Sequence, residues 1–244
     1  MGKTTICAIL AQLFAEDGFD VLAIDADPNT NLGMAFGIGP QESPESLIKM
    51  KELIAERTGT GKDAVGSYFR LNPTVNDLPE KYWLKVNNVK LLVLGAITHA
   101  GAGCACPEGA FLKAMLRHTI LQRKELVIID LAAGVEFMGR ASIQGIDMLV
   151  LIVEPGERSI ETANRMGQMA KELGIKHVGA IANKITSSGQ IDLIRDKMKN
   201  IIMLGGIDYS SSLQEADMQL IPVYGADNRI IKALEGVKQN ILEL

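Results

Sequence analysis

The chain has 244 residues, 47% of them hydrophobic, which is enough to bury the core of one α/β domain. We therefore expect a single domain over residues 1–244. The formal net charge of -4 argues against a broad basic face for nucleic acid. Three cysteines form no disulfide framework, no export signal opens the sequence, and no apolar run reaches the ~20 residues of a membrane-spanning helix. These features predict a cytoplasmic protein with reduced thiols and with neither a membrane nor a nucleic-acid partner.

The chain is expected to open on a helix, because apolar residues at positions 6, 9, 10, 13 and 14 share one helical face. Short, continuous apolar runs then predict strands covered on both faces, at 21–25, 90–95, 126–130, 148–153 and 177–183. Further helices are predicted at 44–57, 107–124, 157–173, 190–200 and 228–242, and the region 39–89 is more polar. This alternation predicts an α/β fold with a mostly parallel sheet flanked by helices, and ligands at the carboxyl ends of the strands.

The first residues, MGKTT, have the sequence of the end of a phosphate-binding loop and lead directly into the first predicted helix. In such a loop, backbone N–H groups surround the phosphates, the lysine contacts the β and γ oxygens, and the neighbouring hydroxyl binds Mg²⁺. The helix N-terminus that attracts phosphate is present, but the first strand and the front of the loop are missing from the chain as written. These few residues alone are only weak evidence for a phosphate-binding loop.

Aspartates stand where two of the predicted strands end. Asp25 and Asp27 follow the run VLAI, and Asp130 follows LVII. Carboxylates at strand ends that face a phosphate loop can hold Mg²⁺ or orient a water molecule. The alternative interpretation is that these aspartates only cap a turn or the next helix.

The motifs GKTT, DADPN, DLAAG and ANK occur in the order and spacing of the MinD/ParA/NifH group of deviant Walker A ATPases, which the sequence resembles over nearly its whole length. The resemblance implies a P-loop NTPase that binds ATP and Mg²⁺, with Lys3 on the phosphates and Asp27 positioning or activating the attacking water. The other implied positions are Gly2 and Thr5 of the loop, Thr4 as a Mg²⁺ ligand, Asp130 holding Mg²⁺ through water, Gly134 of the following switch, and Asn183 at the adenine edge.

One feature of the family loop is absent from the sequence. The loop reads KGGxGKTT, and its early lysine normally reaches the partner's nucleotide in a homodimer, but this chain has no such lysine. Either the protein has lost ATP hydrolysis, or Met1 is an internal methionine of a GGMGKTT-like loop. We favour the second interpretation, because a helix, switch residues and a base-reading pair would serve no shared purpose without a loop.

Cys104 and Cys106 lie in the glycine-rich stretch GAGCACPEG, just before a predicted helix. A single CxC supplies too few ligands for a four-coordinate thiolate site, so it indicates a metal shared across a symmetric dimer. Zinc, copper(I) or nickel would suit such a site, and the alternative is two small residues in a flexible loop. His99 is a weak candidate for an extra ligand, and Cys7 is predicted to lie in the core.

The position of this pair, with DLAAGVE and VEPGERSIETANRM after it, resembles the CooC group of nickel-insertion ATPases. In that group the CxC pairs of two subunits bind metal, which implies Cys104 and Cys106 as ligands of Ni²⁺ or Zn²⁺, a homodimer, and carbon monoxide dehydrogenase as client. Three alternatives stay open: an iron–sulfur carrier ATPase, a MinD/ParA-like positioning ATPase, and a metal-binding scaffold without ATPase activity. The iron–sulfur carriers usually have CxxC near the C-terminus, and the mixed charge of residues 228–244 favours a packed helix over a membrane-binding tail.

Overall fold

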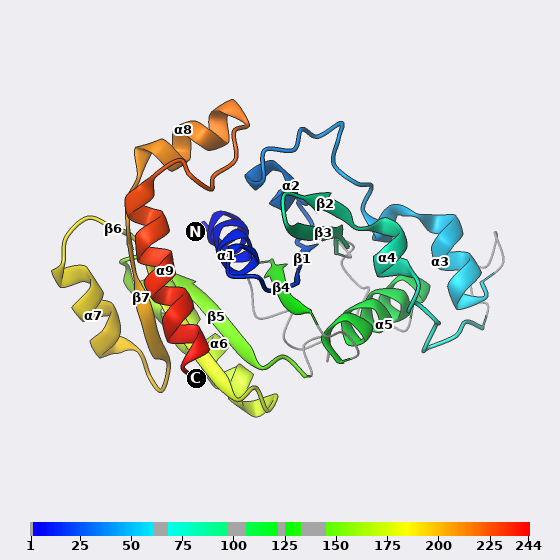
Figure 1. Ribbon diagram of the computed structural model, residues 1–244. Helices are drawn as coiled ribbons and strands as arrows, with labels where there is room; N and C mark the ends of the chain where they lie inside the picture. Colours follow the sequence, from blue (N-terminus) through cyan, green and yellow to red (C-terminus); the bar gives the residue numbers. More distant parts are fainter. Residues whose placement is uncertain (1, 61–67, 97–105, 122–124, 133–144) are drawn as a thin grey trace.

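A computed structural model of the chain describes all residues except 1, 61–67, 97–105, 122–124 and 133–144. Its strands form two sheets (Figure 1). The first contains, in spatial order, β2 (Leu84–Val86), β3 (Val89–Val93), β1 (Val21–Ala26) and β4 (Leu126–Leu131). The second contains β5 (Met148–Val153), β6 (His177–Ile185) and β7 (Ile202–Asp208). All neighbouring strands pair in parallel except β2 with β3.

Helices cover both faces of each sheet, which explains why the strands read as continuous apolar runs. One layer, of α1 (Lys3–Glu16) and α9 (Asn228–Leu242), shares a hydrophobic core with strands of both sheets (Figure 1). The opposite face of the first sheet packs against α3 (Lys51–Thr58), α4 (Leu78–Tyr82) and α5 (Pro107–Leu121). The opposite face of the second packs against α6 (Glu157–Glu172) and α7 (Gly189–Lys197). The short α2 (Leu32–Ala35) follows β1, and α8 (Ser211–Gln219) follows β7.

The two sheets meet at α1. No pairing joins β4 to β5 in the described ranges, and half-buried apolar residues of both strands pack against the core that α1 builds. Among the described residues, no strand precedes α1 in the chain. The same helix therefore packs against strands of both sheets.

The predicted strands and most predicted helices are confirmed within a few residues of their ends. The single helix predicted at 44–57 is wrong in its first half, where the structure has a 3₁₀ turn, η1 (Leu47–Lys49), ahead of α3. Two hydrogen bonds to the end of β3 hold this segment in place. The Ser46 hydroxyl donates to the Leu94 carbonyl at 2.9 Å, and the Ile48 N–H donates to the same oxygen at 3.2 Å. These bonds replace the helical ones that the first turn would need.

Sequence reasoning missed β7, whose interior contains a glycine pair. A Cβ added to Gly205 would lie 2.8 Å from Val237 of α9, and one added to Gly206 would lie 2.5 Å from Ile191 of α7. The two glycines thus let helices approach both faces of the strand closely, and they also weaken the strand signal in the sequence. The helices α2, α4 and α8 and the short edge strand β2 were not predicted either. No helix in the described part of the chain is long and apolar enough to cross a bilayer.

Alanine substitutions at two glycines should change the free energy of unfolding in opposite directions. Gly37, after α2, has φ +81°, and an added Cβ would lie 2.7 Å from Pro222 Cδ and 3.0 Å from its backbone nitrogen. Gly236 lies inside α9, and a Cβ there meets nothing within 4 Å. We expect Gly37→Ala to lower the free energy of unfolding by about 1–2 kcal/mol. Gly236→Ala should raise it by about 0.5–1 kcal/mol. Urea denaturation of both variants checks this, and equal stabilities would contradict the described contacts.

Candidate functional site

The residues predicted to bind nucleotide converge where α1 begins, at the carboxyl ends of β1, β4 and β6. Gly2 precedes the helix with φ +77°, a left-handed conformation that favours glycine, and its carbonyl accepts the N–H of Ile6 at 3.1 Å. A Cβ at Gly2 would lie 2.7 Å from Nδ2 of Asn183. The structure therefore places the start of the chain directly against the β6 asparagine that the sequence analysis assigned to the adenine edge.

Asp130 lies beside the first turn of α1. Its side chain is 3% exposed, and burial is the main cause that raises the pKa of this carboxyl. A hydrogen bond with the Thr4 hydroxyl and the charge of Lys3 both act in the opposite direction on that pKa. The buried oxygen Oδ2 has no hydrogen-bond partner among the described residues, which is unfavourable in an isolated chain. An oxygen of this kind beside a hydroxyl and a lysine fits a hard cation such as Mg²⁺ next to phosphate.

Asp27 follows β1 and lies near Asp130, since its negative charge contributes to the raised pKa of Asp130. One oxygen of Asp27 accepts the Asn29 N–H at 2.9 Å, so this residue also forms the turn that the alternative interpretation expected. Its side chain is partly exposed, unlike those of Asp25 and Asp130. Asp27 is thus the carboxylate of the three that solvent can reach.

Asp25 lies at the end of β1, in register with Asp130 of β4, and its side chain is 0% exposed. Oδ1 accepts the N–H of Asp27 at 3.2 Å, and Oδ2 accepts the N–H of Leu32 at 2.8 Å. Burial raises the pKa of Asp25 to about 6, although the two N–H donors act to lower it. Sequence reasoning placed Asp25 at the strand end but found no specific role for it.

Asn183 is 7% exposed and stands where the pairing of β6 with β7 shifts register. The next residue, Lys184, has φ 57°, which is uncommon for a residue with a side chain. Its Nζ lies 2.8 Å from a Glu154 oxygen beyond the end of β5, and this contact is the main cause that lowers the pKa of Glu154. The bulge therefore ties the ends of β5 and β6 together beside Asn183.

The remaining predicted residues are placed less completely. Thr5 lies in the first turn of α1 and is half-buried. Gly134 and Cys104 lie outside the described residues, as does His99. Cys7 belongs to the core around α1, as predicted. In the ranges that the structure covers, no three His, Cys, Asp or Glu side chains are grouped to hold a metal ion.

Cys106, the described member of the CxC pair, directly precedes α5 and is half-buried. The N–H of Gly109 donates to its sulfur at 3.2 Å, and the N–H of Ala110 donates to its carbonyl at 3.0 Å. Burial is the largest cause of the raised pKa of this thiol, to which the nearby Glu108 charge adds. Cys106 is thus held by the first turn of its own helix.

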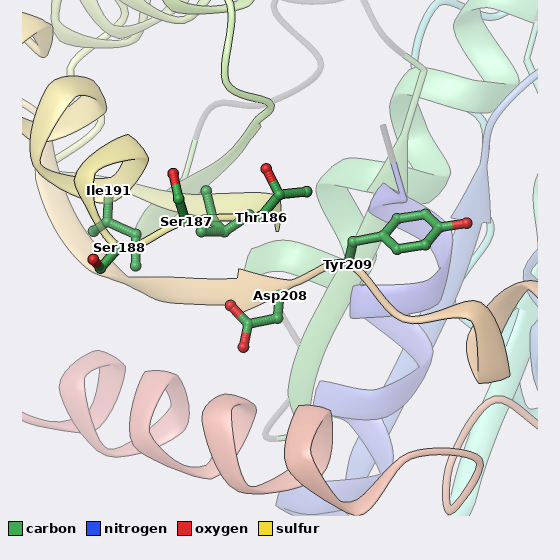
Figure 2. Close-up of a pocket in the computed structure, with 7 residues that line it drawn as sticks. Thr186, Ser187, Ser188, Ile191, Asp208 and Tyr209 are labelled. Carbon is green, nitrogen blue, oxygen red and sulfur yellow. The ribbon is translucent and has the colours of Figure 1, made fainter.

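An open hollow that the sequence analysis did not predict lies beyond Asn183, at the carboxyl ends of β6 and β7. Figure 2 shows Thr186, Ser187 and Asp208 bordering it, while the ring of Tyr209 points away from them. The full lining is Ile185, Thr186, Ser187, Ser188, Ile191, Asp208 and Tyr209. None of the predicted site residues lines this hollow, and only the small polar run after ANK could have indicated it.

Comparisons with known proteins identify the family and the fold of the chain. Residues 1–223 match the CobQ/CobB/MinD/ParA nucleotide binding domain family. The chain is 42% identical over 227 residues to the carbon monoxide dehydrogenase accessory protein CooC of Rhodospirillum rubrum, covering 92% of this chain and 86% of that protein. It is 37% identical to an ATP-binding protein of Methanocaldococcus jannaschii, covering 100% and 95%. MinD of Pyrococcus horikoshii, solved with Mg-ADP, shares the fold with a TM-score of 0.70 at 19% identity, covering 98% and 90%.

The contact between Gly2 and Asn183 can be tested with a matched pair of glycines. Gly2 and Gly18 stand at opposite ends of α1, and both have positive φ, but a Cβ at Gly18 meets nothing within 4 Å. We expect Gly2→Ala and Gly18→Ala each to cost about 1–2 kcal/mol of stability from backbone strain. Only Gly2→Ala should also displace Asn183 and weaken ATP binding, by about tenfold for each 1.4 kcal/mol of lost interaction. Calorimetric titration with ATP checks this, and equal affinities for the two variants would contradict it.

Proposed function

Because the chain is an ATPase of the CobQ/CobB/MinD/ParA nucleotide-binding family, we propose that it is a metallochaperone that uses ATP to insert nickel into carbon monoxide dehydrogenase. The observation that carries this proposal is the 42% identity to CooC over 92% of the chain, together with the CxC pair. The proposed client enzyme is taken from the name of this relative. The proposed binding of ATP rests on the residues at the start of α1.

In this proposal the start of α1 binds the phosphates. The partial positive charge of the helix N-terminus and the ammonium of Lys3 attract the anionic phosphates, and Thr4 with Asp130 would hold Mg²⁺. When bound, Mg²⁺ neutralises charge that develops on the phosphate oxygens during transfer. The unpartnered oxygen of Asp130 supports this assignment, because a cation or its water shell would satisfy it.

Asp27 is the proposed residue that orients the attacking water. It is the partly exposed carboxylate of the site, and the Asn29 N–H fixes one of its oxygens. A carboxylate held at a strand end near phosphate can accept a hydrogen bond from water and align it. Asn183, which is buried against Gly2, would read the adenine edge.

Cys104 and Cys106 are the proposed ligands of the transported metal, and two such pairs from a homodimer would complete a four-coordinate thiolate site. The thiol of Cys106 must lose its proton to bind a metal ion, so metal binding would release protons. Ni²⁺ is the proposed cargo, and Zn²⁺ suits the same ligands. ATP bound between the subunits would bring the two pairs together, and hydrolysis would release the metal to the client.

A positioning ATPase of the MinD/ParA type is the second candidate, because it fits the same family. A membrane-binding version needs an exposed apolar face on the terminal helix. In the structure, Ile230, Leu234 and Val237 of α9 are buried in the core that contains α1 and β7. The packing of α9 argues against a membrane-binding version, and flotation with liposomes would test it.

We expect the wild-type chain to bind one Ni²⁺ or Zn²⁺ per two subunits in the presence of ATP. Cys104→Ser and Cys106→Ser should each abolish this binding, because a hydroxyl replaces the soft thiolate ligand. Cys7→Ala is the matched control, since Cys7 is buried in the core and should not affect the metal. Metal content after gel filtration, combined with light scattering for mass, checks the stoichiometry.

Two outcomes would contradict this proposal. Metal binding that survives both serine variants would show that the CxC pair is not the site. Equal metal affinity with and without ATP would remove the coupling, since linkage requires each ligand to change the affinity of the other by the same factor. Visible absorption by a cluster after anaerobic reconstitution would instead favour an iron–sulfur carrier.

A further inference from the structure

Asp25 is a buried carboxylate to which the proposed function assigns no role. Its main-chain carbonyl accepts the N–H of Leu94 at 2.9 Å and of Gly95 at 3.0 Å, so its backbone is fixed between β1 and the end of β3. Each side-chain oxygen already accepts a backbone N–H. With 0% exposure and a backbone donor on each oxygen, this carboxylate is held within the fold by main-chain groups.

The two N–H groups that Asp25 accepts belong to the two ends of one short segment. The segment runs from Asp27, whose N–H lies 3.2 Å from Oδ1, to Leu32, whose N–H lies 2.8 Å from Oδ2. A carboxylate that accepts hydrogen bonds from two backbone donors forms charge-assisted bonds, which are stronger than neutral ones. Asp25 therefore closes residues 27–32 into a loop with a defined shape.

At the α2 end the segment is fixed by the packing of Leu32 in the core with α1, but no local cap satisfies the first N–H of the helix. Asn31 precedes α2 without a side-chain hydrogen bond to the helix, and α2 has only four residues, too few to be stable by its own hydrogen bonds. The first N–H of α2 is satisfied by Asp25 instead of by a local cap. Losing the carboxylate would therefore leave the buried N–H of Leu32 unpaired at this end of the loop.

We propose that Asp25 is a positioning residue, which sets the place of Asp27 by holding both ends of the 27–32 segment. This inference rests on the proposed role of Asp27 in orienting water. The Asp27 carboxylate follows the strand by one residue, and one of its oxygens is bound within the same segment by Asn29. The orientation of the Asp27 carboxylate therefore depends on the shape of the loop, and Asp25 accepts hydrogen bonds from both ends of that loop.

Asp25→Asn tests the proposal with little change in side-chain size. The amide has one acceptor oxygen, so its NH₂ group would face the N–H of either Asp27 or Leu32. We expect kcat for ATP hydrolysis to fall by about 10-fold to 100-fold, the range that a misplacement of about 1 Å produces. The dissociation constant for ATP should stay within about twofold, because the affected interaction acts in the reaction and not in binding.

A double variant shows whether Asp25 acts through Asp27. In an Asp27→Asn background, Asp25→Asn should lower kcat no further, because the group that it positions is already gone. Gly37→Ala is the matched stability control, since it strains the far end of the α2 region without touching Asp25. It should lower stability but leave kcat near that of the wild type at a temperature where all variants are folded.

Several results would overturn the proposal. One is a kcat for Asp25→Asn that is no lower than the kcat of Gly37→Ala. Another is a double variant whose loss of kcat equals the product of the losses in Asp25→Asn and Asp27→Asn. If Asp25→Asn does not fold, Asp25→Ser, which can still accept one N–H, takes its place. Failure of both to fold would show a purely structural role. A wild-type chain without hydrolysis, or full activity of Asp27→Asn, would instead remove the premise, and neither result involves Asp25.

Discussion

The burial of α1 between the two sheets is the constraint on which the site depends. Every residue from Ile6 to Ala15 is buried and all but Gln12 are apolar, as expected for a helix inside a core. The helix axis and register are therefore fixed by packing on β1, β4, β5 and α9. Since the helix cannot slide, its first turn is held where Asp130 and Asn183 stand.

Burial also separates the roles of the three aspartates. Asp25 and Asp130 are equally removed from water, and burial raises the pKa of each. Asp25 has two backbone donors to offset this cost, whereas one oxygen of Asp130 has no partner in the described part of the chain. A satisfied buried carboxylate is suited to hold structure, and an unsatisfied one is suited to bind a cation. Asp27, which is partly exposed, is the carboxylate proposed to orient the attacking water.

Much of the fold could be predicted because its strands are covered on both faces, and continuous apolar runs such as that of β5 are hard to mistake. The missed elements lack that signal. The Gly205–Gly206 pair interrupts β7, and the first half of the helix predicted at 44–57 forms hydrogen bonds with Leu94 that no local pattern encodes. In the site, local motifs were sufficient to predict that Lys3, Thr4 and the strand-end aspartates lie together at the start of α1. The hydrogen bond that the Leu32 N–H donates to Asp25 and the contact of Gly2 with Asn183 could not be predicted, because they depend on how loops and distant segments meet in three dimensions.

The most direct test of this account is the Mg²⁺ dependence of ATP binding to the full chain, compared between the wild type and Asp130→Asn by calorimetry with Mg²⁺ or with a chelator. The account predicts that Mg²⁺ strengthens ATP binding to the wild type, because it satisfies the buried oxygen of Asp130 beside Lys3 and Thr4. Asp130→Asn should lose most of this gain while still binding ATP without the metal. An undiminished Mg²⁺ effect in Asp130→Asn would contradict the placement of the cation at the start of α1.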